Sequence, residues 1–575
     1  MTSTTKTCDT FLYHAARLAG TSLLRRLDRE AHFRPFFDLS VREGFMRARH
    51  ASWDCVDMSG RFTDAWILMR QMMDWPVTEE DEGVRRYLLA MQSPEDGLFY
   101  DRSVGTHPGH RSHKTHRSHK SYRSYAHKAD WPDPALGEPE TADMFCQSRA
   151  LMGLASWFLE SGEDRIQECI ERLAKGLWKI AAKKDDFCYY LGHRYSPSGW
   201  TGVSAYTAKD IGHAALPAYG VLQILPLTRY WEATRSPAAE RLILGLMNFF
   251  VRESGVIRED GSFTGHLHSW GILPSVLGIL RYAMATGREE IIPWCKRVFD
   301  FIVSQSSSFG WVPDGIEVDD GIITGETCVI TDLIHLGVKL AECGHDECLD
   351  YVEVMARNQL LENQVRDVGR FKFESPEVRA MTLGAYDSWV MPNGLTGCSE
   401  LGLEGCCTAS AIRAVYLAWK HAITLANGEV RVNLMLSRRS EWLDTMSHQP
   451  FEGRFGILVH KPATVMVRMP SWINLREIRV TKDGAAVQPA WVSSHLRIED
   501  ARPGSRIDIE FPIPERQTEE QIGGRTYRLT WRGITLMKIE PPGDVYPIFQ
   551  RNLDGMATLN TLPLDNLKSV PSVDW

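Results

Sequence analysis

The stretch LAWKHAITLANGEV, residues 417 to 430, divides the sequence into two parts with different patterns. Before it, apolar residues recur at helical spacing, and after it, short segments alternate apolar and polar residues. A period of two is typical of half-buried strands, whereas a helix repeats about every 3.6 residues. We therefore predict a helical domain at residues 1–425 and a β-sandwich region at residues 426–575.

The helical part repeats one pattern. An apolar helix is followed by a turn that contains glycine or proline, and a second helix begins with charged residues. Such turns lie at 158–168, 231–241, 282–292 and 340–350. Gly162, Gly287 and Gly344 suit helix C-caps, and the acidic residues after them favour the positive end of the next helix. Successive hairpins predict a toroid of paired helices whose connecting loops gather at one rim, where a functional site would form.

Residues 105–128 fit neither pattern, since they repeat RSHK twice and hold six histidines with hardly an aliphatic side chain. Such a segment buries too little apolar surface to offset the entropy of ordering it. We predict a His-rich disordered insertion near these residues. A metal-binding or RNA-binding tract is the functional alternative.

Length and charge limit the class of protein. A chain of 575 residues is too long for one ordinary core, so two or more domains are expected. The first twenty residues lack a secretory signal, and no apolar run is long enough to span a membrane, so we expect a cytoplasmic protein. A net charge of −8 offers no broad positive field, which argues against nucleic acid and membrane partners.

Two cysteine-bearing segments predict a metal site. GETC at 325–328 offers Glu326 and Cys328, and EGCCTAS at 404–410 offers Cys406 and Cys407. Three thiolates and one carboxylate suit a tetrahedral, borderline-soft divalent ion, and Zn²⁺ fits that ligand set best. The alternative is that Cys406 and Cys407 are two core cysteines at the start of a helix, since free cysteine is often buried.

The same segments resemble a known family. ETC, a gap of nearly eighty residues, and CC followed by a helix with Arg413 resemble the bacterial β-L-arabinofuranosidases of glycoside hydrolase family 127 (GH127). HLHSWGILPSVLGILRYAMATG at 266–287, VNLML and VMVRMPSWI also look like segments of that family. The resemblance covers about residues 140–515. It implies an (α/α)₆ helical barrel followed by β-sandwich material, in agreement with the hairpins and alternating strands.

The resemblance also implies roles for the cysteines. In GH127 the residue matching Cys406 is the nucleophile, and those matching Glu326, Cys328 and Cys407 complete a zinc site that also holds it. His268 matches a substrate-binding histidine. Attack by a thiolate on an anomeric carbon would give a thioglycosyl intermediate and retention of configuration.

The acid/base residue is where this sequence departs from the family pattern. The family places a glutamate about sixteen residues before the ETC glutamate, but position 310 is glycine here. The only glutamate between 301 and 325 is Glu317, to which we assign the role. The rivals are Asp314, Asp319 and Asp320, and a solvated acidic loop is the non-catalytic alternative for each.

The histidines show a second departure. The family has a Gly-His pair at the position of Gly220, whereas Gly-His occurs here about two helical turns earlier, with His213. His213 either reaches the site from there or lies on the surface. His266 shares a loop with His268 and carries the same ambiguity. These changes indicate a divergent member whose sugar can differ from arabinofuranose.

Three functions compete at this point. The leading interpretation is a zinc-dependent retaining glycosidase that releases a terminal sugar from a small glycoside or oligosaccharide. The second keeps the barrel but makes it a sugar epimerase or lyase, which needs no thiolate. The third is a non-catalytic sugar-binding protein whose zinc has all four positions filled by the protein. The sequence does not determine the oligomeric state, and a homodimer is one arrangement compatible with it.

Overall fold

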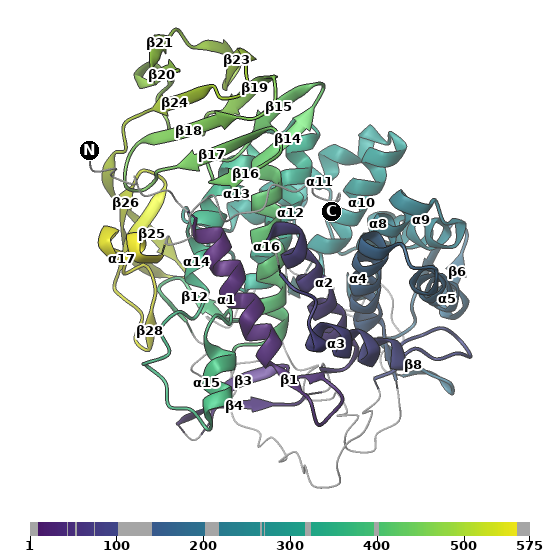
Figure 1. The fold of residues 1–575 in the computed structure, drawn as a ribbon. Helices are drawn as coiled ribbons and strands as arrows, with labels where there is room; N and C mark the ends of the chain where they lie inside the picture. Colours follow the sequence, from purple (N-terminus) through teal and green to yellow (C-terminus); the bar gives the residue numbers. More distant parts are fainter. Residues whose placement is uncertain are drawn as a thin grey trace.

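The computed structural model contains a helical barrel, drawn in purple to green, and β-sheets in green to yellow (Figure 1). It describes residues 10–42, 44–51, 54–73, 75–101, 141–201, 218–264, 267–268, 271–316, 324–395 and 402–559. The His-rich insertion predicted near residues 105–128 lies outside these ranges.

Six helices form a closed inner ring in which each contacts the next, and α16 returns to α2. They are α2 (Val56–Met72), α4 (Met144–Ser161), α8 (Ile224–Thr234), α10 (Leu273–Thr286), α12 (Thr327–Glu342) and α16 (Gly405–Ala422). Six others cover the ring from outside: α1 (Phe11–Arg25), α3 (Glu79–Ala90), α5 (Asp164–Ile180), α9 (Pro237–Arg252), α11 (Ile292–Ser304) and α13 (Cys348–Arg357). The predicted (α/α)₆ barrel is confirmed.

Inner and outer helices differ in how much of their surface is covered. Every residue of α16 is buried, as expected for a helix enclosed on all sides. In the outer helix α5, burial is limited to one stripe that includes Ile166, Ile170 and Leu177. This spacing of three to four residues is the pattern from which the hairpins were predicted.

Glycine and serine residues lie at several of the helix ends, where the sequence contains them. Gly162 and Gly287 adopt left-handed conformations (φ of 67° and 71°) at the C-caps of α4 and α10, as predicted. Gly344 lies one position later than predicted, after the cap residue Cys343 of α12. Ser236 caps the N-terminus of α9 by accepting from the backbone N–H of Ala239.

The barrel runs directly into a β-sandwich, since α16 ends at Ala422 and strand β14 begins at Ile423. One sheet holds β14 (Ile423–Ala426), β15 (Glu429–Val432), β19 (Ala463–Arg468), β23 (His495–Ala501) and β22 (Ala490–Val492). The other holds β16 (Arg438–Arg439), β17 (Leu443–Ser447), β18 (Arg454–Val459), β24 (Arg506–Glu510), β20 (Arg479–Lys482) and β21 (Ala485–Val487). Apolar side chains from both sheets share one core.

The last strands form a third sheet instead of extending the sandwich. It contains β25 (Glu515–Ile522), β26 (Arg525–Arg532) and β27 (Thr535–Glu540). These strands pack in a separate core together with Trp311, Leu395 and Leu403 of the helical part. Beyond them, β28 (Tyr546–Pro547) pairs with β13 (Gly394–Leu395), which pairs with β12 (Val390–Met391). The C-terminal strands therefore brace the barrel.

Short elements fill the connections. The strands are β1 (Leu27–Asp28), β2 (Arg34–Pro35), β3 (Asp38–Arg42), β4 (Phe45–Arg49), β5 (Ala142–Asp143), β6 (Ala182–Lys184), β7 (Phe187–Tyr189), β8 (Arg194–Ser196), β9 (Gly199–Thr201), β10 (Leu267–His268) and β11 (Gly315–Ile316). The helices are α14 (Gln359–Glu362), α15 (Pro376–Thr382), α17 (Leu553–Leu559), η5 (Glu289–Ile291) and η6 (Leu475–Glu477).

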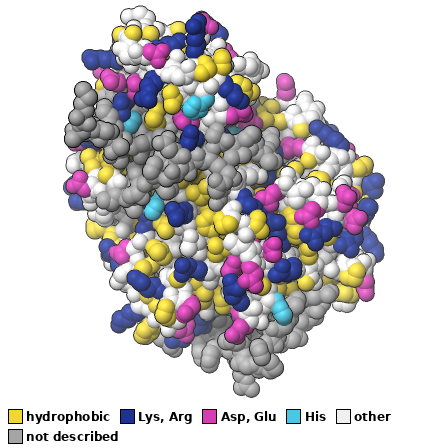
Figure 2. All heavy atoms as spheres, viewed as in Figure 1, with side chains coloured by type: hydrophobic (Ala, Val, Ile, Leu, Met, Phe, Trp, Pro, Cys, Tyr) yellow, Lys and Arg dark blue, Asp and Glu magenta, His cyan; other side chains and the backbone are white. Residues whose placement is uncertain are grey.

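The surface shows charges of both signs. On the face drawn in Figure 2, basic and acidic side chains are interspersed, as the small net charge predicts. Within the described ranges, no helix combines the length and apolar composition needed to cross a membrane.

Candidate metal centre at the barrel rim

The first turns of the inner helices meet at one end of the barrel. Arg61 of α2 donates to Ser410 Oγ of α16 over 3.0 Å, and Gln223, just before α8, donates to the backbone carbonyl of Met144 in α4 over 2.6 Å. Because inner helices alternate with outer ones along the chain, all six run in the same direction. Their N-termini share a rim, in line with the site location that the hairpins predicted.

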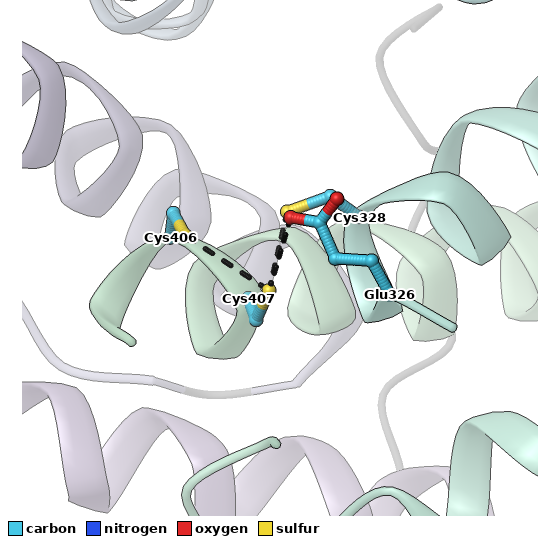
Figure 3. Close-up of side chains that lie close together, drawn as sticks. All are labelled: Glu326, Cys328, Cys406 and Cys407. Atoms are coloured by element: carbon cyan, nitrogen blue, oxygen red, sulfur yellow. Dashed lines mark hydrogen bonds between the residues drawn. The ribbon is translucent and has the colours of Figure 1, made fainter. Parts of the chain in front are cut away.

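Glu326, Cys328, Cys406 and Cys407 come together at this rim (Figure 3). Glu326 is the N-cap residue of α12, and Cys328 follows in its first turn. Both cysteines of the pair lie in the first turn of α16. All four side chains are buried, and their ligand atoms lie within 4.8 Å of one another. The four residues can therefore hold one metal ion.

The position of Cys406 corrects an expectation from the sequence. Gly402 and Gly405, just before the cysteine pair, predict a glycine-rich loop that carries Cys406, but α16 already begins at Gly405. The sharp turn occurs earlier, at Gly402, whose φ is +78°. A Cβ there would lie 2.2 Å from Asp38 Oδ1. Adjacent cysteines can face one ion because Cys328 and Glu326 approach the start of α16 from the neighbouring helix.

The spacing of the donor atoms tests whether zinc fits. Cys407 Sγ lies 3.5 Å from Cys328 Sγ and 3.9 Å from Cys406 Sγ. It lies 3.6 Å from Glu326 Oε1. In a tetrahedral zinc site with ordinary bond lengths, two thiolates are about 3.8 Å apart, and a thiolate and a carboxylate oxygen about 3.6 Å. The observed edges match these values, so the four residues fit Zn²⁺.

The three thiols differ in how readily they ionise. Burial disfavours the Cys328 thiolate, but hydrogen bonds from Cys406 and Cys407 and the charge of Arg61 lower its pKa well below the usual value. Burial and the neighbouring Cys328 and Cys406 raise the pKa of Cys407 well above that value. The hydrogen bond with Cys328 also raises the pKa of Cys406. Metal binding must therefore displace protons from this cluster.

Arg61 is a buried cation beside the cluster that sequence reasoning missed. Its Nη1 lies 4.0 Å from Cys328 Sγ and 3.0 Å from Ser410 Oγ, while its Nε donates to Asp57 Oδ1 over 2.7 Å. Burial alone would lower its pKa, but Asp57 and the cysteines raise it well above the usual value. The site therefore keeps a fixed positive charge. The only signal in the sequence is a charged pair within the apolar run of α2.

Glu404 is the second residue that sequence reasoning missed. It is the N-cap residue of α16 and is buried, with 5% of its surface exposed. The Cys406 thiol donates to its Oε2 over 3.5 Å. Its backbone N–H donates to Ser388 Oγ over 2.9 Å. A carboxylate thus lies beside Cys406, and the glutamate directly before Gly-Cys-Cys is its signal in the sequence.

Comparisons with known proteins give the fold a name. No protein-family model matches the sequence, and no curated protein matches it significantly. Among solved structures, a GH127 β-arabinofuranosidase superposes with a TM-score of 0.61 at 15% identity, covering 92% of this chain and 83% of that one. The chain has the GH127 fold. This confirms, for the fold, the resemblance that the cysteine motifs indicate.

Two further solved structures also resemble this chain in fold. A GH127 β-L-arabinofuranosidase from Geobacillus stearothermophilus T6 has a TM-score of 0.54 at 13% identity, covering 91% of this chain and 80% of that one. A structure described as a glycoside hydrolase has a TM-score of 0.54 at 12% identity, with coverages of 84% and 77%. Each match includes residues of both the barrel and the β-sheet region, because it covers more residues than either part alone.

Five other candidate residues are named only by their positions in the sequence. Glu317, Asp319, Asp320, His213 and His266 lie outside the described residues. In the chain, these positions directly precede α8, α10 and α12, the inner helices that begin at the rim. Their roles stay predictions.

The structure describes the backbone of His268 and the position of Asp314. His268 lies in β10, which pairs with β11 so that His268 is opposite Gly315. The pairing brings the chain segment of the predicted substrate histidine next to the segment that leads to Glu317. Asp314 is buried, and its backbone N–H donates to the carbonyl of Thr324 over 2.8 Å. Asp314 thus lies beside the strand that leads to Glu326.

Arg413, which is part of the family motif, lies deeper in the barrel of the GH127 fold than the cysteines. It contacts Asp64 of α2 over 3.2 Å and Asp332 of α12 over 3.7 Å. All three side chains are buried. Arg413 therefore ties α16 to both neighbouring inner helices beneath the cysteine cluster.

Proposed function

We propose that this protein is a retaining glycosidase that releases a terminal sugar, β-L-arabinofuranose or a related one, with Cys406 as the nucleophile. The observation that carries the proposal is the buried group of Glu326, Cys328, Cys406 and Cys407 at the rim of a GH127 fold. These residues would hold Zn²⁺, which supplies thiolates at neutral pH by displacing the thiol protons. The relatives named as β-arabinofuranosidases suggest the substrate class.

Exposure and contacts favour Cys406 over Cys407 as the nucleophile. Cys406 keeps 6% of its surface exposed, whereas Cys407 is completely buried and Cys328 is 1% exposed. Cys407 contacts both Cys328 and Glu326 inside the cluster, while Cys406 is at its edge next to Glu404. A sugar can approach the edge of the cluster, but it cannot reach a sulfur that is enclosed by the other ligands.

The reaction then proceeds in two displacements. Cys406 Sγ forms a bond to the anomeric carbon as the bond to the leaving oxygen breaks, and the carboxyl group of Glu317 gives that oxygen its proton. A water molecule next attacks the anomeric carbon, Glu317 takes its proton, and the carbon–sulfur bond breaks. Two inversions give retention. His268, His266 and His213 are proposed to bind the sugar hydroxyl groups.

One experiment separates catalysis by Cys406 from other uses of the fold. A panel of aryl glycofuranosides and glycopyranosides is assayed with wild type, Cys406→Ser and Cys407→Ser, and a covalent cyclophellitol-type or haloacetamide glycomimetic is mapped by peptide mass spectrometry. We expect an adduct on Cys406 and a loss of turnover of about a thousandfold or more in Cys406→Ser. An adduct on Cys407 alone, or inverted product by NMR, would refute the mechanism.

A non-catalytic sugar-binding protein is the second candidate, because four protein donor atoms within 4.8 Å of one another would fill a tetrahedral ion and leave no open position. Under that alternative, the protein binds sugars and metal, but no glycoside of the panel is hydrolysed and no adduct forms. The same experiment therefore distinguishes the two.

A further inference from the structure

A cavity of about 400 Å³ shares no lining residue with the cysteine cluster. It is enclosed by α1, the segment after α14, β28 and α17, which gather on the left of Figure 1. Pro450 of the β-sandwich also lines it. Its volume is within the range of pockets that bind small molecules, about 300–1,000 Å³.

Two basic side chains line this cavity without a carboxylate partner. Among the residues that the structure describes, neither His14 nor Arg366 has an acidic group within ion-pair distance, and both are half-buried. Toward the described residues, the guanidinium of Arg366 donates one side-chain hydrogen bond, from Nε to Gln364 Oε1 over a long 3.4 Å. Its two terminal nitrogens are therefore available to a ligand.

The two acidic residues that line the cavity are already engaged elsewhere: Asp367 Oδ2 lies 3.4 Å from Arg370 Nε, and Glu362 pairs with Arg551. Glu362 Oε1 accepts from Arg551 Nε over 2.7 Å, and Glu362 Oε2 accepts from the backbone N–H of Phe549 over 2.6 Å. Arg551 in turn donates to Asn358 and to the backbone carbonyls of Arg357 and Leu536. Arg551 and Glu362 thus pair with each other in the lining of the cavity, and Glu362 forms no ion pair with Arg366.

The electrostatic environment agrees with this geometry. Burial and the nearby Arg366 and Arg17 lower the pKa of His14. Burial also lowers the pKa of Arg366, against the opposing effect of Glu362. The charge of Arg366 therefore disfavours the charged form of His14 in a partly desolvated space. An anion between them would remove that cost and accept charge-assisted hydrogen bonds from both.

We propose that this cavity binds a small organic oxyanion, whose carboxylate or phosphate group is held by Arg366 and His14 and whose carbon skeleton packs on Phe11 and Tyr546. Planar guanidinium groups match the geometry of both oxyanions. Phe11 and Tyr546 line the cavity and give it an apolar side. The site is separate from the metal centre, so it binds its ligand whether or not the proposed glycosidase activity is correct.

Isothermal titration calorimetry tests the proposal with four probes: glucuronate, glucose 6-phosphate, inorganic phosphate and neutral glucose. We expect saturable binding of about one glucuronate or one glucose 6-phosphate per chain and none of glucose at the same concentrations. Binding of the carboxylate but not the phosphate, or the reverse, identifies the headgroup. Binding of inorganic phosphate alone, or of neither organic anion, would overturn the proposal.

Matched variants assign the binding to the cavity. Arg366→Gln should weaken the anion at least tenfold, whereas Arg379→Gln, an exposed arginine on α15, should leave it unchanged. His14→Gln should weaken it less, and it replaces Arg366→Gln if that variant fails to fold. Equal affinity in wild type, Arg366→Gln and His14→Gln would refute the site. Metal content should be the same in all four proteins.

Discussion

Replacing Arg61 by methionine should raise the pKa of the most acidic thiol in the cysteine cluster. Arg61 Nη1 is 4.0 Å from Cys328 Sγ, and both groups are buried. Two unit charges at that separation attract by about 4 kcal/mol at an effective dielectric constant of about 20. Since about 1.4 kcal/mol corresponds to one pKa unit, the upper bound is about three units. Asp57 loses its Arg61 partner in the variant and takes up a proton, which keeps the increase in the Cys328 pKa below that bound.

The assay is a pH titration of the metal-free protein, in which thiolate formation is followed by ultraviolet absorbance. Metal affinity is then measured by competition with a chelator at neutral pH, where each unit of increase in pKa should cost about tenfold in apparent affinity. The sign follows from the charge: the cation of Arg61 favours the thiolate, so its removal favours the thiol, which must lose a proton to bind metal.

Two controls separate charge from loss of packing. Arg61→Lys keeps the positive charge, so the pKa of Cys328 should stay close to its wild-type value. The lysine loses the simultaneous hydrogen bonds to Asp57 and Ser410. The double variant Arg61→Met with Asp57→Asn removes both buried charges, so that no unpaired ion is left to unfold the barrel. An unchanged thiol pKa in a folded Arg61→Met protein would refute the electrostatic role of Arg61.

Three further outcomes are expected. Protein prepared without chelator should hold about one zinc per chain by metal analysis, and stripping the metal should lower the melting temperature because the ion binds only the folded cluster; near-zero zinc would contradict this. Glu317→Gln should slow hydrolysis of substrates with poor leaving groups much more than of activated ones, and equal slowing of both would move the acid/base role to Asp314 or Asp319. Gly402→Ala should destabilise the protein by more than Gly428→Ala, because φ is +78° and +77° at the two sites but only the first would also place a Cβ 2.2 Å from a neighbouring atom; strain at a left-handed site costs about 1–3 kcal/mol, and equal losses in chemical denaturation would remove the steric argument.

The ring of helices could be predicted because its signals are local. The stripe of Ile166, Ile170 and Leu177 and the glycine at 162 lie within one hairpin, so a short window of sequence contains them. The alternating strands were predicted for the same reason. Alternation does not say which sheet a strand joins, however. The sequence therefore did not distinguish the separate sheet of β25–β27 from the sandwich.

The site was predicted in part. The clustering of Glu326, Cys328, Cys406 and Cys407 was predicted from the residue types of two short segments and from the family motif that they resemble, but the start of α16 was misplaced because of the glycines before Cys406. The N-cap residue Glu404 is not one of the usual capping residue types and makes no side-chain capping hydrogen bond, so the sequence contained no capping signal for the start of this helix. Arg61 was missed because it is 267 residues from Cys328 in the chain, and its charge is explained only by the folded barrel.

The closed ring of inner helices has a consequence for synthesis on the ribosome. The first inner helix, α2, must pair with the last, α16, and Arg61 and Ser410 are 349 residues apart in the chain. Until α16 has left the exit tunnel, the apolar sides of α2 and α12 that it will cover remain exposed on a nascent chain. Folding of the barrel therefore waits for nearly three-quarters of the protein, and a chaperone that covers α2 during that delay would protect it from aggregation. The cysteine pair arrives with this closing helix, so metal loading can only follow the completion of the ring.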